Sequence, residues 1–156
     1  MTSADFCLRL PSLLMSRPVD RLLRLMARLR SPRGCPWDRE QTHRSLIPCL
    51  RNEAKEVIHA IESKDPHALR EELGDLLLQV VFHAQLAREK GRFDFRDVVS
   101  TLIRKLVRRH PHVFGGARAR DAKAVLQQWN AIKAREKRDR RHARNRPRIS
   151  LARRRR

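Results

Sequence analysis

Apolar positions along the chain recur at helical spacing in five stretches. The first helix is predicted over residues 19–29, and Ser-Pro-Arg-Gly at 31–34 stops it. The segment Cys-Pro-Trp-Asp at 35–38 follows as a predicted loop. A second helix is predicted from about residue 45 to residue 64, because its leucine, valine and isoleucine positions share one face.

A third helix is marked by its ends as well as by its apolar stripe. Asp65 is a good N-cap, and Pro66 suits the first helical position because its missing N–H has no partner there. Gly91 is placed to terminate the helix near Lys90. The breadth of the stripe over residues 65–90 predicts that this helix is the centre of the core.

Two further helices complete the pattern. Asp94 can cap a fourth helix, which Pro111 closes. Residues 110–116 are predicted to be a loop. A fifth helix begins near Asp121 and places Trp129 on its apolar face before a basic tail takes over.

Composition supports an all-α fold class. A chain of 156 residues can bury one core, and five glycines, seven aromatic residues and no tyrosine argue against a β-sandwich or barrel. We expect a helical bundle built on a helical hairpin. One domain is expected over residues 18–137, with an N-terminal extension at 1–17 and a basic, disordered tail at 138–156.

The positive charge is distributed unevenly. Lysine and arginine number 37 against 17 acids, for a formal net charge of +20, which taken alone would favour a nucleic-acid partner. Residues 133–156 hold more than half of this excess and include only two acids, Glu136 and Asp139. Such a block repels itself, so we expect disorder after the last helix, over residues 138–156, with nonspecific nucleic-acid contact as an open alternative.

Cysteine usage and the N-terminus indicate the compartment. The three cysteines lack CxxC spacing, which favours a reducing cytoplasm over a disulfide framework. Zinc binding by Cys35, His43 and Cys49 matches no common ligand spacing. The apolar stretch at residues 6–15 is interrupted by Arg9 and is followed by no cleavage site, so we expect neither a signal peptide nor a membrane partner.

Two pairs of acidic residues stand out within the predicted hairpin. Glu53 and Glu56 are three residues apart on the second helix, and Glu72 and Asp75 are three apart on the third. The hairpin should fold at about residue 64, and the centre of each pair is about 9.5 residues from that point. At about 1.5 Å per residue, both pairs should lie roughly 14 Å from the turn, at the same height.

Four carboxylates at one level beside apolar stripes require a cation. Mg²⁺ prefers oxygen ligands and completes its shell with water and substrate phosphates, so the quartet suits Mg²⁺ with a nucleotide. Gly74 lies between two of the acids, and a mid-helix glycine suggests the close approach of a backbone or ligand. The alternative is that the acids are solvated and pair with Arg51, Lys55 and Arg70.

Basic residues could supply the other half of a phosphate site. Lys105 and Arg109 share one face of the fourth helix, and Lys133 lies four residues after Trp129. Such cations can neutralise a triphosphate during attack by water, although in this basic chain the spacing can also be coincidence. The position of Trp129 on an apolar helix face favours packing over stacking on a base. Trp37, in a predicted loop, is the better candidate for nucleotide recognition.

Several segments taken together resemble the MazG-type nucleoside triphosphate pyrophosphohydrolases over about residues 18–137. They are Cys-Pro-Trp-Asp at 35–38 with Gln-Thr-His at 41–43, Asn-Glu-Ala-Lys-Glu-Val at 52–57, Glu-Glu-Leu-Gly-Asp-Leu-Leu at 71–77, Gly-Arg-Phe-Asp at 91–94, Arg-His-Pro-His-Val-Phe-Gly at 109–115, and Trp129 with Lys133. The resemblance implies an all-α fold that dimerises around a helical bundle. It also implies hydrolysis of the α–β bond of nucleoside triphosphates with Mg²⁺, giving monophosphate and pyrophosphate.

The resemblance also assigns roles by position in the motifs. The Mg²⁺ ligands and catalytic residues would be Glu53, Glu56, Glu72 and Asp75, with Mn²⁺ as an alternative ion. Contacts to phosphates and nucleotide would come from Lys105, Arg109, Trp129 and Lys133. Nucleoside triphosphate is then the expected substrate, and a second copy of the chain is the expected protein partner.

Three departures from the family pattern qualify this hypothesis. Asn52 replaces the first acid of the EExxE motif, and Lys55 adds a cation beside the cluster. The chain resembles the first copy of members that carry two tandem domains, and such copies need not be equally active. The alternatives are a catalytically weakened nucleotide-binding dimer and a helical protein that binds nucleic acid through its basic tail.

Overall fold

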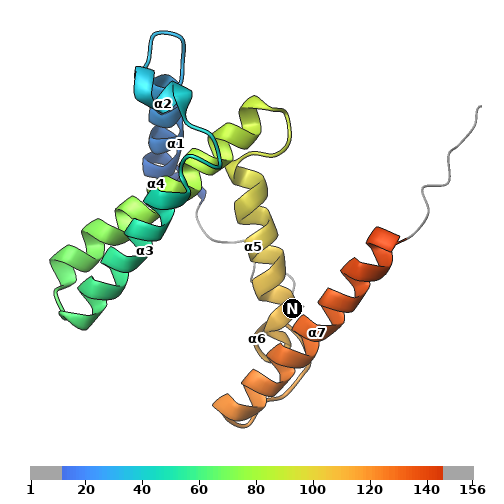
Figure 1. The fold of residues 1–156 in the computed structure, drawn as a ribbon. Helices are drawn as coiled ribbons and strands as arrows, with labels where there is room; N and C mark the ends of the chain where they lie inside the picture. Colours follow the sequence, from blue (N-terminus) through green and yellow to red (C-terminus); the bar gives the residue numbers. More distant parts are fainter. Residues whose placement is uncertain (1–11, 146–156) are drawn as a thin grey trace, which may run out of the picture. The chain divides into compact units, whose positions relative to one another are not determined.

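The computed structural model describes residues 12–145, with side chains described for residues 18–142, and this part of the chain is helical without strands (Figure 1). The helices are α1 (Ser12–Leu29), α2 (Pro36–Glu40), α3 (Ile47–Glu62), α4 (Pro66–Glu89), α5 (Phe95–Arg109), α6 (Pro111–Phe114) and α7 (Ala122–Asn145). The all-α prediction is confirmed.

The capping residues begin three of the helices where the sequence placed them. The Asp65 carboxylate accepts from the backbone N–H of His67 at 2.8 Å. The Asp94 carboxylate accepts from the N–H of Arg96 at 2.7 Å, and Asp121 caps α7 in the same way. Each side chain satisfies an N–H that has no partner within its helix.

Two predicted loops contain short helices. Pro36 begins α2 and Pro111 begins α6, so both segments were wrongly expected to be entirely non-helical. Proline suits the first turn because its fixed φ angle matches the helix and its missing N–H is not needed there. Pro111 therefore ends α5, as predicted, and also begins a new turn.

Helices α1 and α7 extend past the expected domain limits. Helix α1 begins at Ser12, and α7 continues through residues 138–145, where disorder was expected. Arginine, lysine and alanine are good helix formers, and the Arg140 Nε donates to the Glu136 carbonyl at 3.2 Å. Residues 1–11 and 146–156, the rest of the expected extension and tail, lie outside the described residues.

The chain divides after Thr101, within α5, into two compact units. In the first unit, α3 and α4 form an antiparallel hairpin, and α1 packs against α4 (Figure 1). The second unit contains the end of α5 together with α6 and α7. The sequence did not indicate this division, because the apolar stripe of α5 runs through it.

The core of the first unit lies along the C-terminal half of α4. Its buried members are Met26, Leu46, Val81, Phe82 and Leu86. These side chains join α1 and the start of α3 to α4, as the apolar stripe of residues 65–90 predicted. The part of the hairpin nearer its turn lies beyond this core and carries the acidic residues.

Several large apolar side chains of the hairpin are exposed. They are Ile58, Ile61, Leu73, Leu77 and Val80. An apolar group of this size on one hairpin is typical of a surface that another element or subunit covers. None of the helices in residues 12–145 combines the length and the apolar character needed to cross a membrane.

Candidate functional site

The α3–α4 hairpin brings its acidic residues to one level. Lys64 has a φ of 57°, in the left-handed region, which allows the chain to reverse between Glu62 and Asp65. Carboxylate oxygens of Glu53, Glu56 and Glu72 all lie within 4.8 Å of one another. The predicted match in height between the two helices is confirmed for these three residues.

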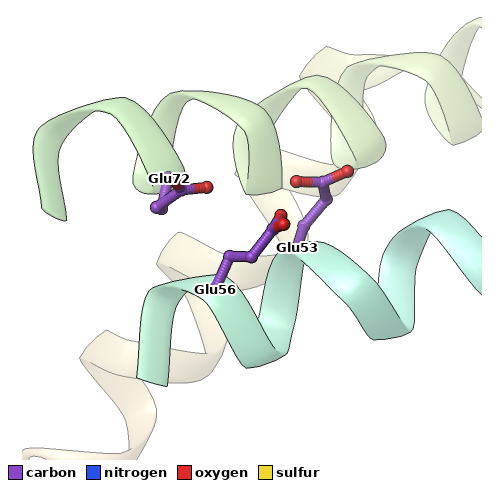
Figure 2. Close-up of side chains that lie close together, drawn as sticks. All are labelled: Glu53, Glu56 and Glu72. Atoms are coloured by element: carbon purple, nitrogen blue, oxygen red, sulfur yellow. The ribbon is translucent and has the colours of Figure 1, made fainter. Parts of the chain in front are cut away.

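Figure 2 shows that the three side chains point toward one another, Glu53 and Glu56 from α3 and Glu72 from α4. Glu53 and Glu72 are half-buried, whereas Glu56 is exposed. The group is therefore open on one side. A ligand could enter this group from the solvent, while α3 and α4 keep the three side chains in place.

The electrostatic environment of the cluster is unfavourable for its own charges. Burial raises the pKa of Glu53, and the hydrogen-bond interaction of its neutral form with Glu56 and the charges of Glu56, Asp75 and Glu72 raise it further. Burial also raises the pKa of Glu72, with further repulsion from Glu56, Asp75 and Glu71. These carboxylates would be stabilised by a cation placed among them.

Asp75 lies outside the group of three that meets within 4.8 Å. Its charge nevertheless raises the pKa of both Glu53 and Glu72, so it acts on the same group. Asp75 is exposed, and its shorter side chain projects from α4 one turn after Glu72. The structure thus gathers three of the four predicted ligands and leaves the fourth beside them.

The alternative of solvated ion pairs finds no support at the cluster. Among the residues with described side chains, no salt bridge joins its acids to Arg51, Lys55 or Arg70. A donor set made only of carboxylate oxygens fits a hard divalent cation such as Mg²⁺. Glu53, Glu56 and Glu72 are the residues that could hold it.

Gly74 requires a correction. A Cβ placed on Gly74 would have no described atom within 4 Å, apart from its immediate neighbours and its own helix backbone. Among the described residues no backbone segment therefore approaches Gly74 closely, and the approach of a ligand stays a prediction. The side of α4 at Gly74 faces open space within the described part of the chain.

Cys35, His43 and Cys49 form no common zinc-ligand pattern in the sequence, and His43 pairs with another histidine in the structure. Cys35 and Cys49 are free thiols. His43 Nδ1 lies 2.9 Å from the Nδ1 of His83 on α4, and the two rings stack with centroids 5.1 Å apart. Trp37 lies in α2 and is 55% exposed, so its ring is free of the core packing that would exclude a recognition role.

The predicted phosphate-binding residues lie in the second unit. Arg109 is buried, and its guanidinium lies 5.0 Å from the ring centroid of Trp129. Trp129 is half-buried and packs edge-on against His110, with centroids 5.1 Å apart. Lys105 is half-buried and Lys133 is exposed.

Sequence reasoning missed the role of Glu136. This carboxylate binds the guanidiniums of Arg108 and Arg109, each at 2.6 Å. By charge alone, Glu136 is one of two acids in the basic stretch 133–156. Its position seven residues after Trp129 places both on one face of a helix, and that spacing was the available signal.

The predicted site residues thus form separate groups in the two units. Glu53, Glu56, Glu72 and Asp75 lie in the first unit, as does Trp37. Lys105, Arg109, Trp129 and Lys133 lie in the second. Within the second unit the structure brings Arg109 and Trp129 together.

Known proteins resemble most of this chain. The family profile for the MazG nucleotide pyrophosphohydrolase domain matches residues 41–114. A nucleoside triphosphate pyrophosphohydrolase/pyrophosphatase MazG from Thermotoga maritima is 55% identical over 118 residues, which cover 76% of this chain and 45% of that protein. A nucleoside triphosphate pyrophosphohydrolase from Escherichia coli K12 is 52% identical over 120 residues, covering 76% of this chain and 46% of that protein. The chain spans about half the length of these two curated relatives.

A solved structure agrees with the fold. The crystal structure of a mazG-related protein from Thermotoga maritima superposes with a TM-score of 0.60 at 27% sequence identity. The match covers 74% of this chain and 98% of that chain. The profile match includes the whole acidic hairpin and the end of α5. Over residues 41–114, the chain therefore carries a MazG nucleotide pyrophosphohydrolase domain.

Proposed function

We propose that this protein hydrolyses nucleoside triphosphates to nucleoside monophosphate and pyrophosphate in a Mg²⁺-dependent reaction, with Mn²⁺ as the alternative ion. The observation that carries the proposal is the meeting of Glu53, Glu56 and Glu72 within 4.8 Å across two helices. Identity above 50% to two proteins named as nucleoside triphosphate pyrophosphohydrolases supports it.

In this proposal Glu53, Glu56, Glu72 and Asp75 hold the metal. When bound, Mg²⁺ would neutralise phosphate charge and lower the pKa of a coordinated water. The water oxygen forms a bond to the α-phosphorus while the bond to the bridging oxygen breaks, so pyrophosphate leaves with that oxygen. A carboxylate oxygen of the cluster would accept the proton of the water.

The cations of the second unit are proposed to hold the substrate. Lys105, Arg109 and Lys133 would bind the phosphates, because concentrated positive charge lowers the cost of charge building on phosphorus. Trp37, more than half exposed, is the proposed contact to the base or sugar. Trp129 would contribute to nucleotide binding as part of this group, because its ring lies against the Arg109 guanidinium.

We further propose that a second copy of the chain completes the helical bundle. The exposed apolar side chains of the hairpin, among them Ile58, Leu73 and Leu77, would be covered in such a homodimer. Leu73→Lys should then yield monomers in analytical ultracentrifugation. Leu25→Lys, which alters an equally exposed leucine of α1, is the matched control. A wild-type monomer would contradict this part of the proposal.

The activity is tested with a panel of ribo- and deoxyribonucleoside triphosphates, incubated with the full chain and Mg²⁺ while pyrophosphate release is measured. Glu72→Gln keeps the size of a proposed metal-binding side chain and removes its charge, so turnover should fall by about 100-fold or more. Glu62→Gln removes a charge from α3 outside the cluster and should retain activity. Release that is equal in wild type and Glu72→Gln would exclude the proposed site.

A second candidate function is nucleic-acid binding through α7. Six exposed cations lie on α7 from residue 133 onward, namely Lys133, Arg135, Lys137, Arg138, Arg140 and Arg141, within the residues whose side chains are described. Binding of this kind should weaken steeply with salt, and Lys137→Gln with Arg141→Gln should reduce the salt dependence by about one counterion per lost contact. Glu72→Gln should leave it unchanged. Affinity for a DNA duplex that is insensitive to salt would remove this candidate.

A further inference from the structure

Two neighbouring arginines of α5 converge on a single carboxylate. Adjacent residues of a helix point about 100° apart, so Arg108 and Arg109 would be expected to diverge. Instead both guanidiniums bind Glu136 of α7. Such convergence requires a partner that draws the two side chains together.

The contacts to Glu136 are close and numerous. Its Oε2 accepts from Arg109 Nη2 at 2.6 Å, and its Oε1 accepts from Arg109 Nε at 3.3 Å and from Arg108 Nε at 2.7 Å. Arg140 Nη2 lies 4.0 Å from Oε2. Arg109 therefore forms a side-on, two-point ion pair, which fixes the plane of its guanidinium.

Trp129 holds the same guanidinium from another direction. The Arg109 Cζ lies 5.0 Å from the Trp129 ring centroid, and His110 packs against the edge of that ring. The Arg109 side chain is only 9% exposed and the Glu136 side chain 12%. Arg109 is thus confined by a carboxylate and by an aromatic ring.

The ion pair is permanent over the physiological pH range. The hydrogen bond from Arg109 is the main reason why the pKa of Glu136 is lowered to about 2, and Arg108 lowers it further. Glu136 therefore remains a carboxylate at neutral pH. The orientation of Arg109 does not depend on a protonation change.

The pairing leaves Arg109 with unused donors. An arginine has five N–H groups, and the side-on pair with Glu136 occupies one at Nε and one at Nη2. Three N–H groups remain, two of them at Nη1. A guanidinium held in one plane with donors to spare is preorganised for phosphate oxygens.

We propose that Glu136 is a positioning residue, which fixes Arg109 against Trp129 so that the remaining donors of Arg109 bind the diphosphate part of the substrate. This rests on the proposed function, in which Arg109 is a phosphate ligand. It also assigns Trp129 a supporting role for Arg109, in place of stacking on a nucleobase with that face of its ring.

Loss of the Glu136 charge should change anion affinity in opposite directions, depending on whether Glu136 positions Arg109 or only adds negative charge. Removing a negative charge near an anion site strengthens anion binding if only the net charge matters. Removing Glu136 should instead weaken binding, because Arg109 loses its fixed orientation. The sign of the change therefore separates a positioning carboxylate from an incidental one.

The test uses the full chain and inorganic pyrophosphate, with a chelator present so that no metal takes part. Calorimetric titration should show that Glu136→Gln raises the dissociation constant of pyrophosphate by about tenfold. Asp139→Asn is the matched control, because it removes one negative charge three residues further along α7. Asp139→Asn should bind pyrophosphate as tightly as wild type or slightly more tightly.

A double-mutant cycle with Arg109→Gln shows whether Glu136 acts through Arg109. Arg109→Gln alone should weaken pyrophosphate binding, and adding Glu136→Gln should then cause little further loss. Independent, additive effects would overturn the proposal. So would unchanged or tighter binding by Glu136→Gln, or the absence of pyrophosphate binding by the wild-type chain.

Two safeguards keep the result interpretable. If Glu136→Gln unfolds at the assay temperature, Glu136→Asp replaces it, since the shorter side chain keeps the charge but withdraws the carboxylate. Weaker binding by Glu136→Asp supports the proposal, and wild-type binding overturns it. Because metal-free pyrophosphate binding needs no turnover, a failure of the proposed hydrolysis is distinguishable from a failure of the Glu136 proposal.

Discussion

Glutamates occupy opposite electrostatic settings in the two units of this protein. In the α3–α4 hairpin, Glu53, Glu56 and Glu72 face one another, and the pKa of Glu53 and of Glu72 is raised by burial and by neighbouring acids. In the second unit, Glu136 lies among arginines, and its pKa is lowered to about 2. Glutamate side chains therefore repel one another in the hairpin, whereas in the second unit a glutamate is neutralised by arginines.

The difference separates a prepared site from a structural element. A chain with a net charge of +20 could neutralise three clustered carboxylates with arginine, as it does at Glu136. The hairpin instead leaves its carboxylates without an ion pair among the residues with described side chains. Carboxylates held close in this way cost stability until a cation arrives, which is typical of sites kept for function.

The largest expected effect comes from neutralising one clustered carboxylate. Glu56→Gln should lower pyrophosphate release from the best substrate of the panel by about 100-fold or more, because a metal ligand is lost. The same change should raise the melting temperature of the metal-free protein, because it removes repulsion from Glu53 and Glu72. Activity assays and thermal melts in chelator measure the two effects.

Glu62→Gln is the control for Glu56→Gln, since it removes a charge from the same helix outside the cluster. It should change neither quantity appreciably. A Glu56→Gln protein that is both fully active and no more stable would show that the clustered carboxylates are ordinary surface acids.

The next effect in size is stabilisation by the metal itself. Mg²⁺ at about 100 times its dissociation constant should stabilise the folded chain by about 2.7 kcal/mol, which corresponds to a rise in melting temperature of roughly 5–10 °C. Glu72→Gln should abolish this rise, whereas Glu136→Gln should retain it. An equal rise in wild type and Glu72→Gln would place the stabilising ion elsewhere.

The two settings should also respond to pH with opposite sign. Glu136 binds its proton less tightly when folded, so its contribution to stability is present above its unfolded pKa near 4.5 and is lost as the pH falls toward about 2. Glu53 and Glu72 bind protons more tightly when folded, so the metal-free chain should lose stability as the pH rises from 4.5 through their raised values.

Denaturant unfolding at a series of pH values separates these contributions. The stability difference between wild type and Glu136→Gln should shrink below pH 4.5, and the difference between wild type and Glu53→Gln should grow above it. These effects should be smaller than the metal effect, because the side chains are partly exposed and screened by solvent. Parallel pH curves for the two variants would contradict the comparison.

The sequence predicted the hairpin well because local rules determine it. Asp65 begins α4 through its capping carboxylate, and Gly91 follows its end with a positive φ. The spacing of the acids from the turn predicted the meeting of Glu53, Glu56 and Glu72. Both inferences need only helix geometry and a short connection. They do not depend on how distant parts of the chain pack.

The sequence predicted the second unit less well, for the opposite reason. The role of Glu136 depends on a contact with Arg109, 27 positions earlier in the sequence and on another helix, and the spacing from Trp129 gives only its face of α7. The continuation of α7 to Asn145 was also missed, because the run of like charges predicts disorder after residue 137. Gly74 shows the limit of rules about single residues, since a mid-helix glycine suggested the close approach of a backbone or ligand and no described backbone segment lies near it.

The smallest effect, and the finest test of the acidic cluster, concerns Asn52. This exposed residue precedes Glu53, at the position where an acid begins the family motif. Asn52→Glu would add a carboxylate next to the cluster, able to bind further metal or orient water, so turnover should rise, by about tenfold or less. It should also lower the melting temperature of the metal-free chain, because it adds like charge.

Steady-state pyrophosphate release and thermal melts in chelator measure these two effects. Thr42→Glu, at an exposed position outside the hairpin, is the charge-matched control. If Asn52→Glu destabilises the metal-free chain and leaves turnover unchanged, the substitution of this acid by asparagine has no catalytic cost, and three close carboxylates with Asp75 suffice for the proposed reaction.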